Sequence, residues 1–242
     1  MAKTYSYLMA YQGCDNANAK NHKIGFAVAD APDGEWVKVE NLTVESAVPT
    51  AYGVAQPSLI NYDKQNKIVL CYSHDWGDHT GQMLREVIVG EGSALVVGPE
   101  NALATDGLKD GADAITFNNA DFAYDSTSGY LYVVRDFNPV ADKGCKLNTA
   151  VQVAKIPFAD LFTDTATWEI VDDKVNWKDL RDKNDVEKMG WVYAYSACIQ
   201  ADAYGFVDGA KALDLAVTVT SYDESTLEYL YYQTITECTV AI

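Results

Sequence analysis

Hydrophobic and polar positions alternate along short segments of this chain, and turn-forming residues separate the segments. The clearest case is 56–75, where two apolar and β-branched runs, 56–62 and 67–73, flank the polar turn 63–66. Alternation with a period of two, bounded by Asp, Asn and Lys, is typical of a β-hairpin. The second run ends in His74-Asp75-Trp76, a polar and aromatic tip where a strand should stop.

The same hairpin pattern recurs twice downstream. Segment 119–124 is followed by a turn at 125–129 and a strand at 130–134, and segment 200–204 by a turn at 207–209 and a strand at 213–220. A hairpin that returns along the chain is the signature of a repeat architecture, so the repeat decides the fold prediction for residues 1–242.

The remaining strand-like segments fit around these hairpins. We expect strands at 5–11, 24–29, 36–39, 82–89, 93–97, 149–156, 167–171 and 228–240. No run of ten or more residues has a helical period, so the class is all-β. Four recognisable units of about four antiparallel strands predict one β-propeller domain over 1–242, with a missing blade as an open question. A β-sandwich is the alternative.

Composition narrows the partners more than the fold. The net charge is −17 and the pI about 4.4, so nucleic acid and anionic membranes are disfavoured as partners. The mean hydropathy is −0.14, and no apolar run approaches the roughly 20 residues of a membrane helix. The first residues show no apolar signal core, which indicates a cytoplasmic protein, or a secreted one if the chain is a processed or expressed fragment.

The five cysteines and three histidines show no metal-binding spacing. No CxxC pair is present, and Cys71 and Cys198 fall inside strand-like runs where a small buried thiol is common. We therefore expect neither a cofactor nor a metal site.

Several short motifs resemble the opening blades of glycoside hydrolase family 43. They are Tyr11 at the end of a strand, Ile24-Gly25-Phe26-Ala27, Pro32-Asp33-Gly34-Glu35-Trp36 and Gln56-Pro57-Ser58. The resemblance implies a five-bladed propeller of the arabinofuranosidase and xylosidase type, whose ligands are arabinose- and xylose-containing polysaccharides. It also implies an axial pocket lined by the starts of the inner strands.

At the positions where that family carries catalytic carboxylates, this chain has amides. They are Gln56, Asn119 and Gln200. An amide does not exchange a proton near neutral pH, whereas glycoside hydrolysis generally uses a pair of carboxylates. The carboxylates nearest to these positions are Asp121, Asp202 and Asp136, and they are the candidates for a displaced catalytic pair.

In a propeller, the start of one strand and the end of the next lie on the same face. The three amides are therefore expected near the polar and aromatic residues that end the second strands. These candidate ligand-binding residues are His74, Asp75, Trp76, Arg135 and Tyr222, and Trp191, which precedes the third hairpin, is a further candidate. Aromatic rings stack on sugar faces, and amides and charges bind hydroxyl groups, so this set suits a sugar site.

Three functions remain open from the sequence. The first is a carbohydrate-active propeller that recognises plant-polysaccharide sugars with weak or no hydrolysis. The second is an active glycosidase that uses displaced aspartates. The third is a structural or interaction propeller without a small ligand.

Overall fold

Antiparallel strands make up nearly all of the regular structure in the computed structural model. The structure describes residues 3–14, 20–108, 119–139, 148–163, 165–176, 193–223 and 228–242. The chain divides into two compact units, Met1–Leu103 and Ala104–Ile242, which we describe separately. In the described ranges, no helix is long and apolar enough to cross a membrane.

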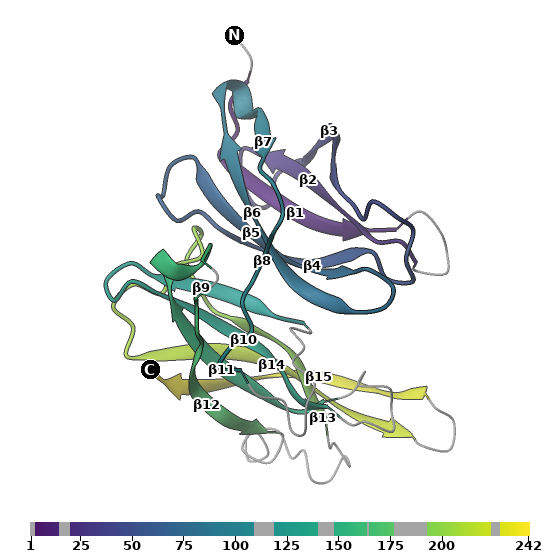
Figure 1. Ribbon diagram of the computed structural model, residues 1–242, viewed down its shortest axis with the longest axis vertical. Coiled ribbons are helices and arrows are strands. Elements are labelled where there is room, and N and C mark those ends of the chain that lie inside the picture. Colours follow the sequence, from purple (N-terminus) through teal and green to yellow (C-terminus); the bar gives the residue numbers. More distant parts are fainter. Residues whose placement is uncertain are drawn as a thin grey trace. The chain divides into compact units, whose positions relative to one another are not determined.

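The first unit contains two antiparallel sheets (Figure 1). One sheet has the order β1-β2-β3, with β1 at Tyr7–Gly13, β2 at Lys23–Ala29 and β3 at Val37–Val44. The other has the order β4-β5-β6-β7, and β8 also pairs with β6. Its strands are β4 Val54–Ile60, β5 Lys67–Asp75, β6 Thr80–Val89, β7 Leu95–Val97 and β8 Asn101–Ala102, with the short 3₁₀ turn η1 at Glu91–Ser93.

The second unit also contains two antiparallel sheets. The order β12-β11-β10-β9 uses β9 Asp121–Asp125, β10 Tyr130–Pro139, β11 Asn148–Pro157 and β12 Glu169–Asn176, with the 3₁₀ turn η3 at Phe158–Asp160. The order β13-β14-β15 uses β13 Tyr193–Ile199, β14 Ala212–Asp223 and β15 Glu228–Ala241.

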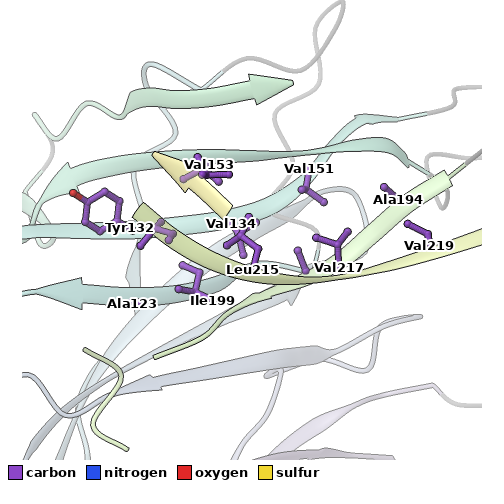
Figure 2. Close-up of a cluster of buried hydrophobic side chains, with 13 residues drawn as sticks. Ala123, Tyr132, Val134, Val151, Val153, Ala194, Ile199, Leu215, Val217 and Val219 are labelled. Carbon is purple, nitrogen blue, oxygen red and sulfur yellow. The ribbon is translucent and has the colours of Figure 1, made fainter. Parts of the chain in front are cut away.

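Each unit has its own apolar core. In the second unit, the two sheets bury a cluster of apolar side chains from β9, β10, β11, β13, β14 and β15, mostly aliphatic with Tyr132 (Figure 2). Val134, Val151 and Leu215 in this cluster are fully buried. In the first unit, Phe26, Leu70 and Tyr72 are among the buried residues of the core. Burial of such side chains is the main stabilising term in an all-β protein, because short antiparallel strands are marginal alone.

An isolated parallel bridge links neighbouring sheets inside each unit, His22 to Gly53 in the first and Tyr124 to Phe206 in the second. Gly53 has φ +82°, and a Cβ there would lie 2.4 Å from the carbonyl oxygen of His22. Only glycine fits at this bridge, because any side chain would separate the two backbones.

The predicted hairpins are confirmed in two cases and shifted in the third. The turns at 63–66 and 125–129 join β4 to β5 and β9 to β10 as expected. The third inner strand is β13, at Tyr193–Ile199, so the prediction of a strand at 200–204 was wrong. Residues 200–211 form the connection to β14, where Asp202 accepts hydrogen bonds from the N–H groups of Tyr204 and Phe206 at 2.8 and 2.9 Å. The tyrosine and aspartate of this connection are turn residues, not strand residues.

Candidate functional site

The three inner strands share one local backbone feature. Gln56, Asn119 and Ser196 each have a positive φ, at 56°, 47° and 48°. In β4 and β13 this residue sits in a β-bulge, between Ala55 and Ser58 and between Tyr195 and Cys198. A non-glycine residue at positive φ is uncommon and marks a functional or strongly constrained position. We call these three positions the bulge positions.

Strand register fixes which residues correspond between the repeats. Two residues after each bulge position, Ser58, Asp121 and Cys198 pair with Cys71, Val134 and Ala216 on the second strand. Ser196 therefore occupies the place that the repeat pattern gave to Gln200. Gln200 lies beyond the far end of β13, is exposed, and donates its backbone N–H to the carbonyl of Asp214 at 2.8 Å.

In the first unit, the bulge position carries a network of neutral polar groups. The Gln56 N–H donates to Gln12 Oε1 at 3.0 Å, and Ser73 Oγ donates to Gln56 Oε1 at 2.7 Å. Gln12 Nε2 lies 3.0 Å from His22 Nδ1. The predicted ligand-binding amide of Gln56 is thus already bonded to the protein on its oxygen. Gln12 and His22 were not predicted, because Gln12 belongs to β1 and His22 precedes β2, both far from Gln56 along the chain.

His74 lies near the end of β5, and Trp76 is the first residue after that strand. His74 is 5% exposed, and its ring stacks with Trp76 at a centroid distance of 4.2 Å. Trp76 also stacks with His79 at 4.7 Å. The Trp76 ring is half-buried, so its stacking surface is taken up largely by two imidazoles instead of being presented to a sugar.

Asp75 organises the loop that precedes β4. Its carboxylate accepts hydrogen bonds from the N–H of Tyr52 and of Gly77, both at 2.8 Å. Burial opposes ionisation, but these donors and the Thr50 hydroxyl hold the pKa of Asp75 below its ordinary value. The ionised carboxylate of Asp75 thus holds the two loop segments together through hydrogen bonds to their backbone N–H groups.

In the second unit, Asp136 accepts the hydrogen bonds that converge from the bulge positions Asn119 and Ser196. Its side chain is 2% exposed and accepts hydrogen bonds from Asn119 Nδ2 at 2.7 Å, Asn148 Nδ2 at 2.9 Å and the Ser196 N–H at 2.8 Å. Burial raises the pKa of Asp136 to about 7, although Asn119, Ser196 and the nearby Arg135 charge act in the opposite direction. A carboxyl group that titrates near neutral pH is suited to general acid–base chemistry.

Arg135 points to the other face of β10, because neighbouring residues of a strand alternate. It is fully buried, and its Nε and Nη2 donate to Gln152 Oε1 at 3.0 and 2.7 Å. Gln152 is its direct partner across the β10–β11 pair. The predicted ligand-binding guanidinium is therefore enclosed in its sheet.

The other two candidate carboxylates come from different segments: Asp121 lies in β9 opposite Val134, two residues before Asp136 in β10, and Asp202 follows β13. Asp121 Oδ2 accepts the N–H of Ile199 at 3.0 Å and so ties β9 to β13. Asp202 belongs to the connection between β13 and β14, at the opposite end of β13 from Tyr193. Asp136 accepts a hydrogen bond directly from the bulge-position amide of Asn119.

The side chains of two predicted ligand-binding residues, Trp191 and Tyr222, are not among those that the structure describes. Trp191 lies outside the described residues. Tyr222 is in β14 and pairs with Tyr229 of β15, and only its backbone is described. Within the described ranges, no three His, Cys, Asp or Glu side chains are grouped so that they could hold a metal ion.

Comparison with known proteins places the fold. No protein-family model and no curated protein matches the chain. The endo-arabinase from Bacteroides thetaiotaomicron VPI-5482 matches with a TM-score of 0.51 and 12% identity, over 98% of this chain and 72% of that chain. An exo-1,5-alpha-L-arabinanase from a bovine ruminal metagenomic library matches with a TM-score of 0.47 and 13% identity, over 97% of this chain and 73% of that chain.

The first of these matches bears on the fold prediction. It spans nearly the whole chain, and the four antiparallel sheets of the two units agree with it. The predicted all-β propeller class and the predicted likeness in fold to the family 43 propellers are confirmed.

Proposed function

We propose that this protein is a carbohydrate-active propeller, acting as one domain over residues 1–242, that recognises arabinose- or xylose-containing oligosaccharides with weak or no hydrolysis. The endo-arabinase match in fold supports the substrate class. The net charge of −17 also favours a neutral ligand over an anionic one.

One observation carries the prediction of weak hydrolysis. The bulge positions hold Gln56, Asn119 and Ser196, none of which can donate or accept a catalytic proton near neutral pH. The two amides are also bonded within the protein, to Ser73 and to Asp136. Glycoside hydrolases generally use two carboxyl groups about 5–9 Å apart. The carboxylate bonded at these positions is Asp136, which accepts from Asn119, Asn148 and Ser196, and Asp121, opposite Val134, is the other acid to test as its partner.

An active glycosidase is the second candidate, and the pKa of Asp136 is the observation that favours it. A carboxyl group whose pKa is raised to about 7 remains partly protonated at neutral pH, as a general acid must be. Its three hydrogen-bond partners all act as donors, however, and that arrangement suits the ionised form.

The test measures binding and turnover on the same protein. We expect isothermal titration calorimetry to detect binding of arabinan and arabinoxylan oligosaccharides, and a reducing-end assay to detect little or no product. Mannan and cellulose fragments are the control ligands. Product release that disappears in Asp136→Asn, Asp121→Asn or Asp202→Asn would establish the glycosidase instead. Absence of both binding and turnover would leave the structural or interaction propeller.

A further inference from the structure

Three polar side chains from separate segments of the first unit form a chain of hydrogen bonds. Ser46 follows β3, His74 is near the end of β5, and Glu100 precedes β8. His74 Nε2 lies 3.2 Å from Ser46 Oγ, and His74 Nδ1 lies 3.1 and 3.2 Å from the two carboxylate oxygens of Glu100. We propose that Ser46, His74 and Glu100 form a hydrolytic triad that cleaves small uncharged esters, an activity separate from sugar recognition.

The hydrogen-bond partners assign the proton on the imidazole. An ionised carboxylate only accepts hydrogen bonds, so the nitrogen that faces Glu100 must carry the proton. In the neutral ring this leaves Nε2 with a free lone pair, toward which the Ser46 hydroxyl directs its hydrogen. Nucleophile, base and orienting acid are thus in the order that a serine hydrolase requires.

The orienting acid and the base are held firmly. Tyr72 Oη donates to Glu100 Oε2 at 2.5 Å, and Arg85 Nη2 lies 3.3 Å from the same oxygen. Arg85 is held in turn by the carbonyl of Gly98 at 2.8 Å and by the Tyr72 oxygen at 2.7 Å. Because the Trp76 ring also stacks on the His74 imidazole, the imidazole has little rotational freedom. Preorganisation of this kind is what a triad needs.

The exposure of the three residues follows the roles. His74 is buried at 5% exposed, and the Glu100 side chain is 24% exposed. Ser46 is partly exposed and is followed by the exposed residues 47–49, so a ligand can reach it from solvent.

The surroundings indicate the substrate class. Trp76 stacks on the His74 ring and packs against the apolar core, so the base lies beside an apolar aromatic surface that suits an apolar acyl group. The net charge of −17 disfavours an anionic acyl group such as succinyl. An acetyl ester meets both conditions.

The proposed reaction needs only water as a second substrate. Ser46 Oγ attacks the ester carbonyl while its proton passes to His74 Nε2. The C–O bond to the alcohol breaks, the alcohol leaves with that proton, and an acetyl-Ser46 ester remains. Water then loses a proton to Nε2 and attacks this ester, which releases acetic acid and restores the serine.

The experiment combines active-site labelling with turnover on the full chain. A fluorophosphonate probe should form an adduct with the peptide that contains Ser46, as located by mass spectrometry. The wild type should hydrolyse p-nitrophenyl acetate at least about 10²-fold faster than Ser46→Ala, because removal of the nucleophile leaves only the background reaction. Ser6→Ala is the matched control, since Ser6 is an exposed serine of the same unit outside the triad; its rate should equal that of the wild type.

Thermal melting of Ser46→Ala checks that the fold is retained, and the adduct on the wild type does not depend on any variant. Labelling of a different residue, equal rates in wild type and Ser46→Ala, or no label and no turnover in the wild type would each overturn the proposal. In those cases the three residues serve only to anchor the loop after β3.

Discussion

Two bulge positions with the same backbone hold different chemistry. In the first unit, the amide of Gln56 meets the hydroxyl of Ser73 at 2.7 Å, and in the second unit the amide of Asn119 meets the carboxylate of Asp136 at 2.7 Å. Strand register makes Ser73 and Asp136 equivalent, since each lies two residues after the partner of Ser58 or Asp121. One repeat therefore holds a neutral pair where the other holds a buried acid.

The difference shows what a buried carboxylate needs. Asp136 has two further donors, Asn148 Nδ2 and the Ser196 N–H. The Ser73 hydroxyl donates instead to Gln56 Oε1 at 2.7 Å, and Gln82 Oε1 lies 3.3 Å from the same oxygen. The same fold thus accepts a charge only where neighbouring strands supply N–H groups, and even there burial keeps the pKa of Asp136 raised.

The largest effect is expected from the titration of Asp136. A raised folded-state pKa means that the stabilising contribution is fully present below the unfolded pKa near 3.8 and is lost as the pH rises through about 7. The free energy of unfolding of the wild type should therefore fall between pH 4 and pH 8, by up to about 4 kcal/mol at roughly 1.4 kcal/mol per pKa unit.

Asp136→Asn is the matched control, because an amide mimics the protonated acid without titrating. In denaturant unfolding at pH 4 and pH 8, the stability advantage of Asp136→Asn over the wild type should be small at pH 4 and largest at pH 8. A wild type that gains stability over Asp136→Asn as the pH rises would show that the three donors outweigh burial.

A carboxylate placed in the first unit should be costly. Ser73 is 9% exposed and faces two amides. We expect Ser73→Asp to destabilise the protein by about 2–3 kcal/mol at pH 7, because the new charge is buried facing the side-chain oxygens of Gln56 and Gln82, and by less at pH 4, where it is protonated. Ser73→Asn measures the effect of size alone, and equal losses for the two variants at pH 7 would contradict the argument.

The smallest effect separates the two amides. Asn119→Ala should cost about 2 kcal/mol at pH 8, where it bonds an ionised Asp136, and less at pH 5. Gln56→Ala should cost about 1 kcal/mol at either pH, because its bond to Ser73 joins neutral groups. Thermal melting at the two pH values gives the comparison, and a pH-independent loss in Asn119→Ala would argue against an ionised partner.

The sequence predicted the hairpins well, because their turns have local chemical signals. The Asp63 carboxylate, for example, accepts the N–H groups of Gln65, Asn66 and Lys67 at 2.9 to 3.0 Å. The prediction for the third repeat was wrong, because the bulge at Ser196 depends on a positive φ that cannot be inferred from a serine in the sequence. The prediction placed Gln200 at this position because it is an amide like Gln56 and Asn119. That reasoning gave more weight to the residue type than to the alternation of the strand.

The polar clusters were harder to predict than the strands. Asp136 was identified from its place at a strand end, but Asn148 and Ser196 come from β11 and β13 and become its neighbours only through sheet packing. His74 was likewise identified, whereas Ser46 and Glu100 lie 28 and 26 residues away from it along the chain. Contacts of that range depend on tertiary structure, and no local pattern encodes them.

The bridge between His22 and Gly53 has a consequence for how the first unit opens. Its backbone hydrogen bonds run from the His22 N–H to the Tyr52 carbonyl at 2.8 Å and from the Val54 N–H to the His22 carbonyl at 3.0 Å, and they join the segments that lead into β2 and β4. Amide protons in β2 and β4 should therefore exchange with solvent in one concerted event, so that the two blades behave as a single foldon.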